Sequence, residues 1–286
     1  MFLVNDTNDF LSWQFGASRW TPDEQAVVES NMAERLNRLA PAAYLMVVTP
    51  EKSVPYQALL PHGLAAVPPA PDRPAPWLAR RFPQACLYPA DRLTALQTHG
   101  LLYFRGDTHV NGLGAFHLYR ETILKLRAQG AQIPPPLEFG MLKPAAIGFE
   151  GDVYVQIDPE QKAVFDADPD SGRWNDMLEI ALAFSIRPGR ARAHQVEPVG
   201  LGDVRARELA VYAHEDQSLP RALIFRDSTA THLVDFMAQH FSRSVFVWHD
   251  RDVAADLVER ERPDIVVHFI AERFLATYPR LSALSR

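Results

Sequence analysis

The carboxyl-terminal part of the chain alternates short apolar segments with segments of helical periodicity. The apolar segments span residues 222–225, 245–248 and 265–270, and the stretches between them carry apolar residues on one helical face. A strand buried on both faces reads as a continuous apolar run, and parallel neighbours need a helical crossover between them. The alternation therefore predicts β-α-β-α-β units, a parallel central sheet and the α/β fold class.

The amino-terminal part shows the same alternation. Residues 1–4 form a short apolar run that predicts a buried strand, and residues 43–48 form a second one. Between these runs, Thr21 followed three residues later by Glu24 is typical of a helix start, because each side chain can accept a hydrogen bond from the other residue's amide. We therefore expect a helix from Thr21 to precede the strand at 43–48.

Two regions interrupt the pattern. Residues 61–78 hold many prolines and little periodicity, which predicts an ordered surface loop or a lid. A short strand over 85–88 and a helix over 90–96 then resume the alternation. Residues 133–221 contain glycine, proline and short alternating pieces, and we interpret them as an inserted, largely β or irregular subregion. The length suits one large domain, so the sequence predicts a single domain spanning 1–286 with this insertion inside it.

Composition excludes several classes of function. The net charge is −6, and Lys and Arg are scattered along the chain, so we expect no nucleic-acid partner. The one cysteine, Cys86, leaves no internal disulfide and no thiol cluster for a metal. No apolar stretch has the length of a bilayer span. The amino terminus lacks the features of a signal peptide, so the chain as given is expected in the cytoplasm, or in the periplasm if a leader was removed.

Ser228 is the candidate nucleophile. It stands where an apolar strand ends and a helical pattern begins, which places it at the carboxyl edge of the sheet, where ligands bind in open α/β folds. The amides of Thr229 and Ala230 in the first turn would hold an oxyanion there. A serine at this position is also a common helix N-cap, and the sequence alone leaves that alternative open.

A serine hydroxyl needs an oriented base before it can attack an ester. Asp107 and His109 offer that pair, because at a spacing of two residues the carboxylate can reach Nδ1–H and leave Nε2 to accept a proton. A capped helix start is the alternative interpretation of this turn. A metal site of Asp107, His109 and His117 has no further ligand at a convincing spacing, so we expect no metal.

The remaining polar candidates have simpler interpretations. His232, His240 and His249 are assigned to the surface or to the edge of the core, and Asp152 after Gly151 to a turn. Neither a phosphate-binding loop nor a dinucleotide fingerprint is present in the sequence. We therefore expect no cofactor.

Four segments carry a resemblance to a known family. Residues 2–8, 107–115, 226–228 and 263–275 resemble, in order, the motifs of the SGNH-hydrolase-like domain of the alginate O-acetyltransferases AlgX and AlgJ. The resemblance spans nearly the whole chain. It implies a three-layer, flavodoxin-like SGNH-hydrolase fold in circularly permuted form, with the Asp-X-His element preceding the serine.

The resemblance also implies roles for individual residues. Ser228 matches the family nucleophile, His109 the general base and Asp107 the acid that orients it. Arg273 matches a position after the last strand that lines the site. Asn5 matches an amino-terminal asparagine that is either a second amide donor at the site or part of a turn held by its own side chain.

The implied activity is O-acetylation of a polysaccharide or sugar hydroxyl through an acetyl-serine intermediate. The partners are then an acetyl donor and a carbohydrate acceptor, together with proteins of polysaccharide assembly. Two departures bear on this: Arg226 stands where the family has glycine, and Val110 where it has tryptophan. Arg226 would either narrow the approach to the ester or bind an anionic sugar. A carbohydrate O-acetyl esterase and a non-catalytic carbohydrate-binding protein on a degenerate fold are the alternatives.

Overall fold

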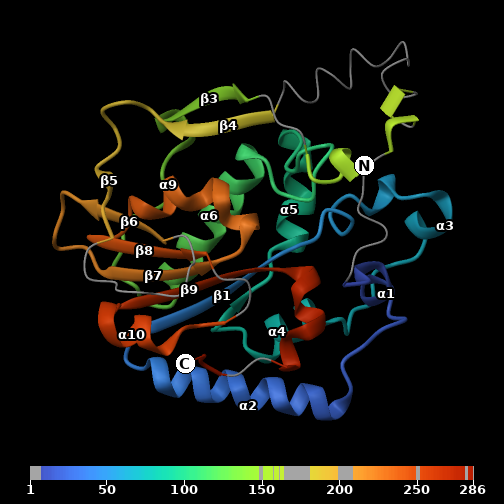
Figure 1. Cartoon of the computed structure of the whole chain (residues 1–286), viewed down its shortest axis with the longest axis horizontal. Coiled ribbons are helices and arrows are strands. Elements are labelled where there is room, and N and C mark those ends of the chain that lie inside the picture. Colours follow the sequence, from blue (N-terminus) through green and yellow to red (C-terminus); the bar gives the residue numbers. More distant parts are fainter. Residues whose placement is uncertain are drawn as a thin grey trace.

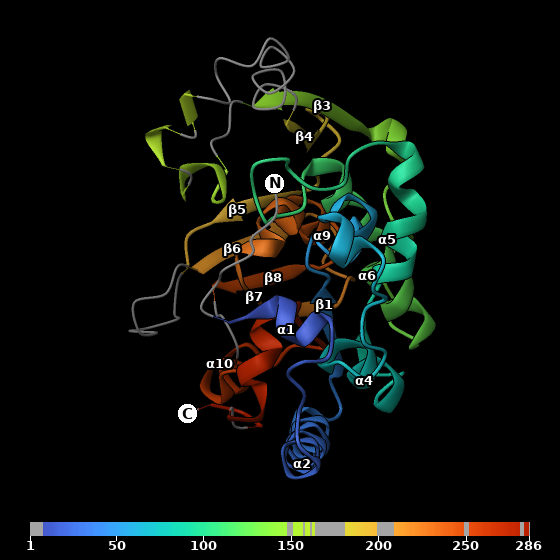
Figure 2. The ribbon, with the colours of Figure 1, turned by 90° about the vertical axis from the view of Figure 1, so that its right-hand side faces the viewer.

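The computed structural model describes residues 8–147, 151–156, 158–160, 162–163, 181–198, 209–248, 252–280 and 283–285. The strand expected over residues 1–4, together with Asn5 and His249, lies outside these residues. Two views at right angles, in Figures 1 and 2, show the arrangement of the described elements.

A seven-stranded sheet forms the centre of the molecule. Its order is β2-β1-β9-β7-β8-β6-β5; the pairs from β2 to β8 are parallel, and β6 and β5 are antiparallel additions at one edge. The bounds are β1 Ala43–Thr49, β2 Cys86–Leu87, β5 Ala193–Val196, β6 Leu209–His214, β7 Arg221–Arg226, β8 Arg243–Trp248 and β9 Ile265–Ala271. The predicted α/β class and mostly parallel sheet are confirmed.

Helices follow most strands. The α-helices are α1 Phe10–Gln14, α2 Pro22–Leu39, α3 His62–Ala65, α4 Pro74–Arg81, α5 Ala90–Leu96, α6 Gly112–Ala128, α9 Val234–Ala238 and α10 Ala255–Glu261. The 3-10 helices are η1 Gln57–Leu59, η2 Gln97–His99, η3 Phe139–Met141, η4 Tyr154–Gln156, η5 Ser228–Leu233 and η6 Glu272–Arg280. None of the helices in the described part is long and apolar enough to cross a membrane.

Apolar side chains cover both faces of the sheet. In β1, Leu45 and Val47 belong to one buried cluster, and Met46 and Val48 to another, as the alternation of a strand requires. The first cluster holds residues of α6 and α9, the second residues of α2 and α10. Figures 1 and 2 accordingly show α2 and α10 on one side of the sheet and α6 and α9 on the other.

The amino-terminal helix begins as predicted. Thr21 and Glu24 form the reciprocal capping box, and α2 follows from Pro22. The prediction of a loop or lid over 61–78 is wrong, because this stretch contains α3 and the first half of α4. Pro74 occupies the first turn of α4, where a proline costs no hydrogen bond, so its presence did not argue against a helix.

The stretch over 133–221 contributes to two sheets. β3 (Leu142–Ile147) and β4 (Ala181–Ile186) form a separate antiparallel pair, which contacts α6, whereas β5 and β6 extend the central sheet. The division of a 1–286 domain by an insertion at 133–221 stays a prediction.

Candidate active site

A closed turn before α6 carries Asp107 and His109. The Phe104 amide donates to the His109 carbonyl at 3.2 Å, and the Asn111 amide donates to the Leu102 carbonyl at 2.9 Å. Asn111 then caps α6 by accepting from the Gly114 amide at 3.0 Å. The turn is therefore held at both ends, and His109 lies just before the helix, as expected.

Asp107 and His109 are hydrogen-bonded to each other. Asp107 Oδ1 accepts from the His109 amide at 2.7 Å and also bonds His109 Nδ1. Asp107 is 1% exposed, so little water competes for its oxygens. The buried Nε2 of His109 has no hydrogen-bond partner among the described residues. The turn thus holds an imidazole whose second nitrogen is left to accept a proton.

The two members of the pair shift each other's pKa. Burial alone would lower the pKa of His109, but the hydrogen bond and charge of Asp107, with the charge of Asp152, outweigh it and raise that pKa above 6.5. Burial alone would raise the pKa of Asp107, but His109 and two backbone amides bring it down to about 2. At neutral pH, Asp107 is therefore a carboxylate.

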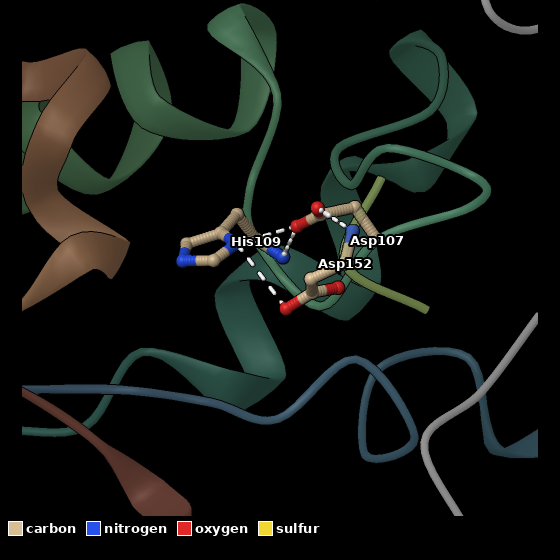
Figure 3. A group of neighbouring side chains, drawn as sticks. All are labelled: Asp107, His109 and Asp152. Carbon is tan, nitrogen blue, oxygen red and sulfur yellow. Dashed lines mark hydrogen bonds and ion pairs between the residues drawn. The ribbon is translucent and has the colours of Figure 1, made fainter. Parts of the chain in front are cut away.

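Asp152 braces the turn from a segment 45 residues further along the chain. Its Oδ1 accepts from the Thr108 amide at 2.8 Å and its Oδ2 from the Thr108 hydroxyl at 2.5 Å, while its own amide donates to Asp107 Oδ2 at 2.6 Å. Asp152 Oδ2 lies 3.7 Å from His109 Nδ1. Figure 3 shows the three side chains converging, with the two carboxylates on the same side of the His109 imidazole.

The approach of Asp152 depends on Gly151. A Cβ placed on Gly151 would lie 2.0 Å from the Gly106 carbonyl oxygen and 2.8 Å from Asp107 Cβ. No side chain fits there. Sequence reasoning assigned Asp152 to an ordinary turn, and the glycine before it was the signal of this close contact.

The same three residues form the one group of metal-ligating side chains found among the described residues. The candidate ligand atoms of Asp107, His109 and Asp152 lie within 4.8 Å of one another. Both carboxylate oxygens of each aspartate, however, already accept a hydrogen bond from an N–H or O–H group. A cation bound by all three residues through His109 Nδ1 would have to break the hydrogen bond from Nδ1 to Asp107, so the donor set fits a hydrogen-bonded acid–base pair better than a metal site. His117 is not a member of the group.

Lys52 stabilises the Asp107 turn through its backbone carbonyls. This buried lysine follows β1, and its Nζ donates to the carbonyl oxygens of Phe104 and Arg105, each at 2.7 Å, and of Asp107 at 3.1 Å. Burial lowers the pKa of Lys52 to about 8, although the charges of Asp107 and Asp152 act to raise it. Lys52 is not among the residues predicted from the sequence.

Arg273 lies beside this turn, 8% exposed. Its Nη1 pairs with Glu51 at 2.7 Å, and its Nη2 donates to the Thr108 hydroxyl at 3.4 Å. The predicted position near the site is thus occupied by a guanidinium that joins η6, the loop after β1 and the Asp107 turn. Its contacts are those of a residue that positions the turn.

Ser228 begins η5 at the carboxyl end of β7. The N-cap is Asp227, not Ser228: Asp227 Oδ1 accepts from the Thr229 amide at 2.9 Å and Oδ2 from the Ala271 amide of β9 at 2.6 Å. The Thr229 hydroxyl donates to Asp227 as well and lies 3.3 Å from the Thr49 hydroxyl at the end of β1. Asp227 therefore links the ends of β7 and β9 directly before the serine, and Thr229 extends the link to the end of β1.

The helix after Ser228 differs from the expected one. Its first six residues form the 3-10 helix η5, and α-helical geometry begins only at Val234. The Thr229 amide bonds Asp227, and the Ala230 amide donates to the Asp227 carbonyl at 3.4 Å. The oxyanion role of Thr229 stays a prediction. To bind an oxyanion, the Thr229 amide would have to give up its hydrogen bond to Asp227.

The helix η5, which carries Ser228, contacts the segment of the Asp107 turn through His232 and Phe104, but Ser228 makes no hydrogen bond to His109. Ser228 is half-buried, and its hydroxyl makes no hydrogen bond to another described residue. His232, four residues later on η5, packs its ring 5.4 Å from Phe104. Burial, followed by the charge of His109, lowers the pKa of His232. In Figure 3, the Nε2 edge of His109 points toward a ribbon drawn in faint orange. Orange is the colour of the chain after residue 220.

Three further residues singled out by sequence, Arg226, Val110 and His240, are all buried. Arg226 is 7% exposed, stacks on Trp248 with Cζ 4.7 Å from the ring centroid, and donates to the Thr231 hydroxyl at 3.3 Å. Its predicted role in binding a substrate stays a prediction. Val110 is fully buried, in a bridge with Tyr103. His240 is a core residue bonded to the Tyr119 hydroxyl at 2.6 Å.

Sequence comparisons give no relative for this chain: no family model and no curated protein matches it. Comparison of structures does. A DHHW family protein from Eubacterium siraeum superposes with a TM-score of 0.61 at 14% identity, covering 94% of this chain and 91% of the other. Bacillus cereus PatB1, solved with a sulfonyl adduct, gives 0.64 at 13% identity, covering 91% and 93%.

A third similar structure bears directly on the resemblance read from the sequence. The O-acetyltransferase domain of Pseudomonas putida AlgJ superposes with a TM-score of 0.54 at 13% identity, covering 90% of this chain and 87% of that domain. At this identity the likeness concerns the fold. The chain therefore has the fold of the AlgJ O-acetyltransferase domain, and the resemblance to AlgJ is confirmed at the level of three-dimensional structure.

Proposed function

We propose that this chain is a serine-dependent O-acetyltransferase that acts on a hydroxyl group of a polysaccharide or sugar. The observation that carries the proposal is the buried Asp107–His109 pair, whose Nε2 has no partner among the described residues. An imidazole held in this way is suited to take a proton from a hydroxyl. The proposal is supported by the fold shared with a domain described as an O-acetyltransferase.

In the first half of the reaction, Ser228 Oγ attacks the carbonyl carbon of an acetyl donor while its proton passes to His109 Nε2. The tetrahedral intermediate collapses, and the leaving oxygen of the donor takes that proton from His109. Asp107, ionised throughout, stabilises the imidazolium formed between these steps. The product of this half is acetyl-Ser228.

In the second half, His109 takes the proton of an acceptor hydroxyl, whose oxygen attacks the acetyl-serine. Collapse of the second intermediate returns the proton to Ser228 and releases the acetylated acceptor. If water replaces the sugar hydroxyl, the same residues release acetate, so a carbohydrate O-acetyl esterase is the second candidate. The exclusion of water from the site decides between the two outcomes.

The proposal includes a circularly permuted, three-layer form of the SGNH-hydrolase fold. Its support is the order of elements along the chain. Asp107 and His109 precede Ser228. The last strands are β7, β8 and β9; Ser228 follows β7, and Arg273 follows β9. The third candidate is a non-catalytic carbohydrate-binding protein, because Arg226 and Val110 depart from the residues of the family. Labelling of the serine distinguishes it from the two enzymes.

The test is labelling by a sulfonyl fluoride, followed by mass mapping of the modified peptide. Ser228 should carry the label, and Ser228→Ala should abolish both labelling and release of nitrophenol from p-nitrophenyl acetate. Ser185→Ala, at an exposed serine on β4, is the matched control and should change neither. A folded protein with no label on Ser228 would favour the non-catalytic binding protein. A sugar acceptor that collects the acetyl group in place of water would identify the transferase.

A further inference from the structure

A groove that the proposed reaction does not use runs along α6. It lies between α5 with η2 on one side and η3 with the β3–β4 pair on the other, and its volume is about 680 Å³. That volume is within the range of small-molecule sites, roughly 300–1,000 Å³. None of Asp107, His109, Asp152 or Ser228 lines it. The groove is thus a separate feature of the surface.

Most of the wall is apolar. Leu113, Phe116 and Leu124 line the groove from α6, and Phe139 and Phe184 line it from η3 and β4. Leu124 is 45% exposed and Phe139 52%, so large apolar side chains remain in contact with water here. A concave apolar surface of this kind gains free energy when an apolar group covers it.

A histidine adds a polar group to this wall. His117 lines the groove, and its buried Nε2 has no hydrogen-bond partner among the described residues. Burial, with the charges of His99, Arg120 and Arg92, lowers the pKa of His117 to about 4. The ring is therefore neutral at pH 7 and adds no charge to the groove.

The charges at the groove favour an anion. Two arginines, Arg92 and Arg120, line the groove together with one carboxylate, Glu121, which pairs with Arg92 at 3.1 Å. Arg120 lies over the Phe116 ring, with Cζ 5.7 Å from the centroid, and uses Nη1 to donate to the Leu137 carbonyl at 3.3 Å. A guanidinium has five N–H donors, so further donors remain for a planar carboxylate.

We propose that this groove binds a small amphiphilic carboxylate, with its alkyl or aryl body on the phenylalanines and leucines and its carboxylate at Arg120. The apolar wall of the concave groove fits the body of such a molecule, and the positive charge of Arg120 fits its carboxylate. The site does not depend on Ser228, so it stands or falls separately from the acetyl-transfer proposal.

The test is titration of the full chain with octanoate by calorimetry, with 1-octanol as the uncharged counterpart. We expect saturable one-to-one binding of octanoate and weaker binding of the alcohol. Arg120→Gln should weaken octanoate binding about tenfold, the effect of losing a charge-assisted hydrogen bond, and leave octanol unchanged. Leu124→Glu should abolish binding of both compounds. Ser228→Ala should bind octanoate like the parent chain.

Leu59→Glu is the matched control, because Leu59 is 67% exposed on η1 and does not line the groove. The melting temperature of each variant is measured, and binding is compared only among variants whose melting temperature equals that of the parent chain. This separates loss of the groove from loss of the fold. Equal affinity for octanoate and octanol, with no effect of Arg120→Gln, would overturn the carboxylate assignment. Absence of saturable binding, or binding that survives Leu124→Glu, would overturn the site itself.

Discussion

Lys52 Nζ lies 3.1 Å from the carbonyl oxygen of Asp107 and reaches two further carbonyls of the same turn. A buried ammonium thus holds the backbone that presents the proposed base. Its three N–H donors match three acceptors, and the match is complete only while the group is protonated. The state of one lysine, remote from the nucleophile in sequence, therefore bears on the geometry of His109.

The first prediction concerns the alkaline side of the activity profile. Because burial lowers the pKa of Lys52 to about 8, kcat/KM for p-nitrophenyl acetate should fall as the pH rises through about 8. Lys52→Arg, whose guanidinium stays charged, should remove this alkaline decline. Lys52→Met should lower activity at every pH, by ~10²-fold if the turn shifts by about 1 Å.

Stability distinguishes this effect from unfolding. The pKa of Lys52 is lower in the folded chain than its ordinary value of 10.5, so between about 8 and 10.5 the unfolded chain binds the extra proton. This group alone makes the folded state more stable as the pH rises through that window. A decline in activity that follows a cooperative loss of circular dichroism would contradict the assignment to Lys52.

The second prediction concerns the contact at Gly151. Gly151→Ala places a Cβ 2.0 Å from the Gly106 carbonyl oxygen, so the Asp107 turn or the Asp152 segment must move. We expect a loss of kcat of ~10²-fold, the effect of a misplaced base, which single-turnover kinetics can measure. Gly140→Ala is the control, since nothing lies within 4 Å of a Cβ there. Equal activity of the two variants would exclude a role for this contact.

The third prediction concerns the acidic side of the profile. His109 must be neutral to act as a base, and its raised pKa moves the loss of activity, as the pH falls, to a higher pH than an ordinary histidine would give. Asp152→Asn removes one of the negative charges that raise this pKa and keeps an oxygen for the Thr108 amide. The midpoint of the acidic limb should therefore move to lower pH.

Asp91→Asn, at an exposed residue of α5, serves as the control for this shift. It should leave the midpoint where it is in the parent chain. A midpoint that stays unchanged in Asp152→Asn as well would mean that the Asp152 charge does not act on His109. Chemical-shift titration of the His109 ring checks the assignment independently of turnover.

How far the sequence predicts this molecule depends on the range of the contacts involved. The strands β7, β8 and β9 and the start of α2 follow from apolar runs and a local capping box, so they were predictable. The helix at Pro74 was missed, because proline density resembles a loop unless its position in the first turn is known.

The site was predictable only in its local part. The Asp107–His109 bond joins residues two apart, and the spacing alone indicates it. Lys52 and Asp152 contribute through contacts between distant segments. A lysine is seldom buried, so nothing in the local sequence marks Lys52, and the only local sign of the Asp152 contact is the glycine before it. Asp227 was likewise passed over in favour of its neighbour Ser228, because its bond to Ala271 requires knowledge of the strand order.

The fourth prediction concerns the buried ion pair of Arg273 and Glu51, joined at 2.7 Å with both side chains 9% exposed. Arg273→Met leaves the Glu51 charge in the interior without its arginine and should cost about 3–5 kcal/mol of the free energy of unfolding. Glu51→Gln with Arg273→Met should cost less than the sum of the single changes, because neither charge is then left behind. Urea denaturation of the four proteins measures the coupling.

The exposed pair Arg19–Asp72, at 3.2 Å, provides the control cycle and should show a coupling of about 0–1 kcal/mol. Coupling of equal size in the two cycles would mean that burial does not strengthen the Arg273 pair, and that the Asp107 turn owes its position to other contacts.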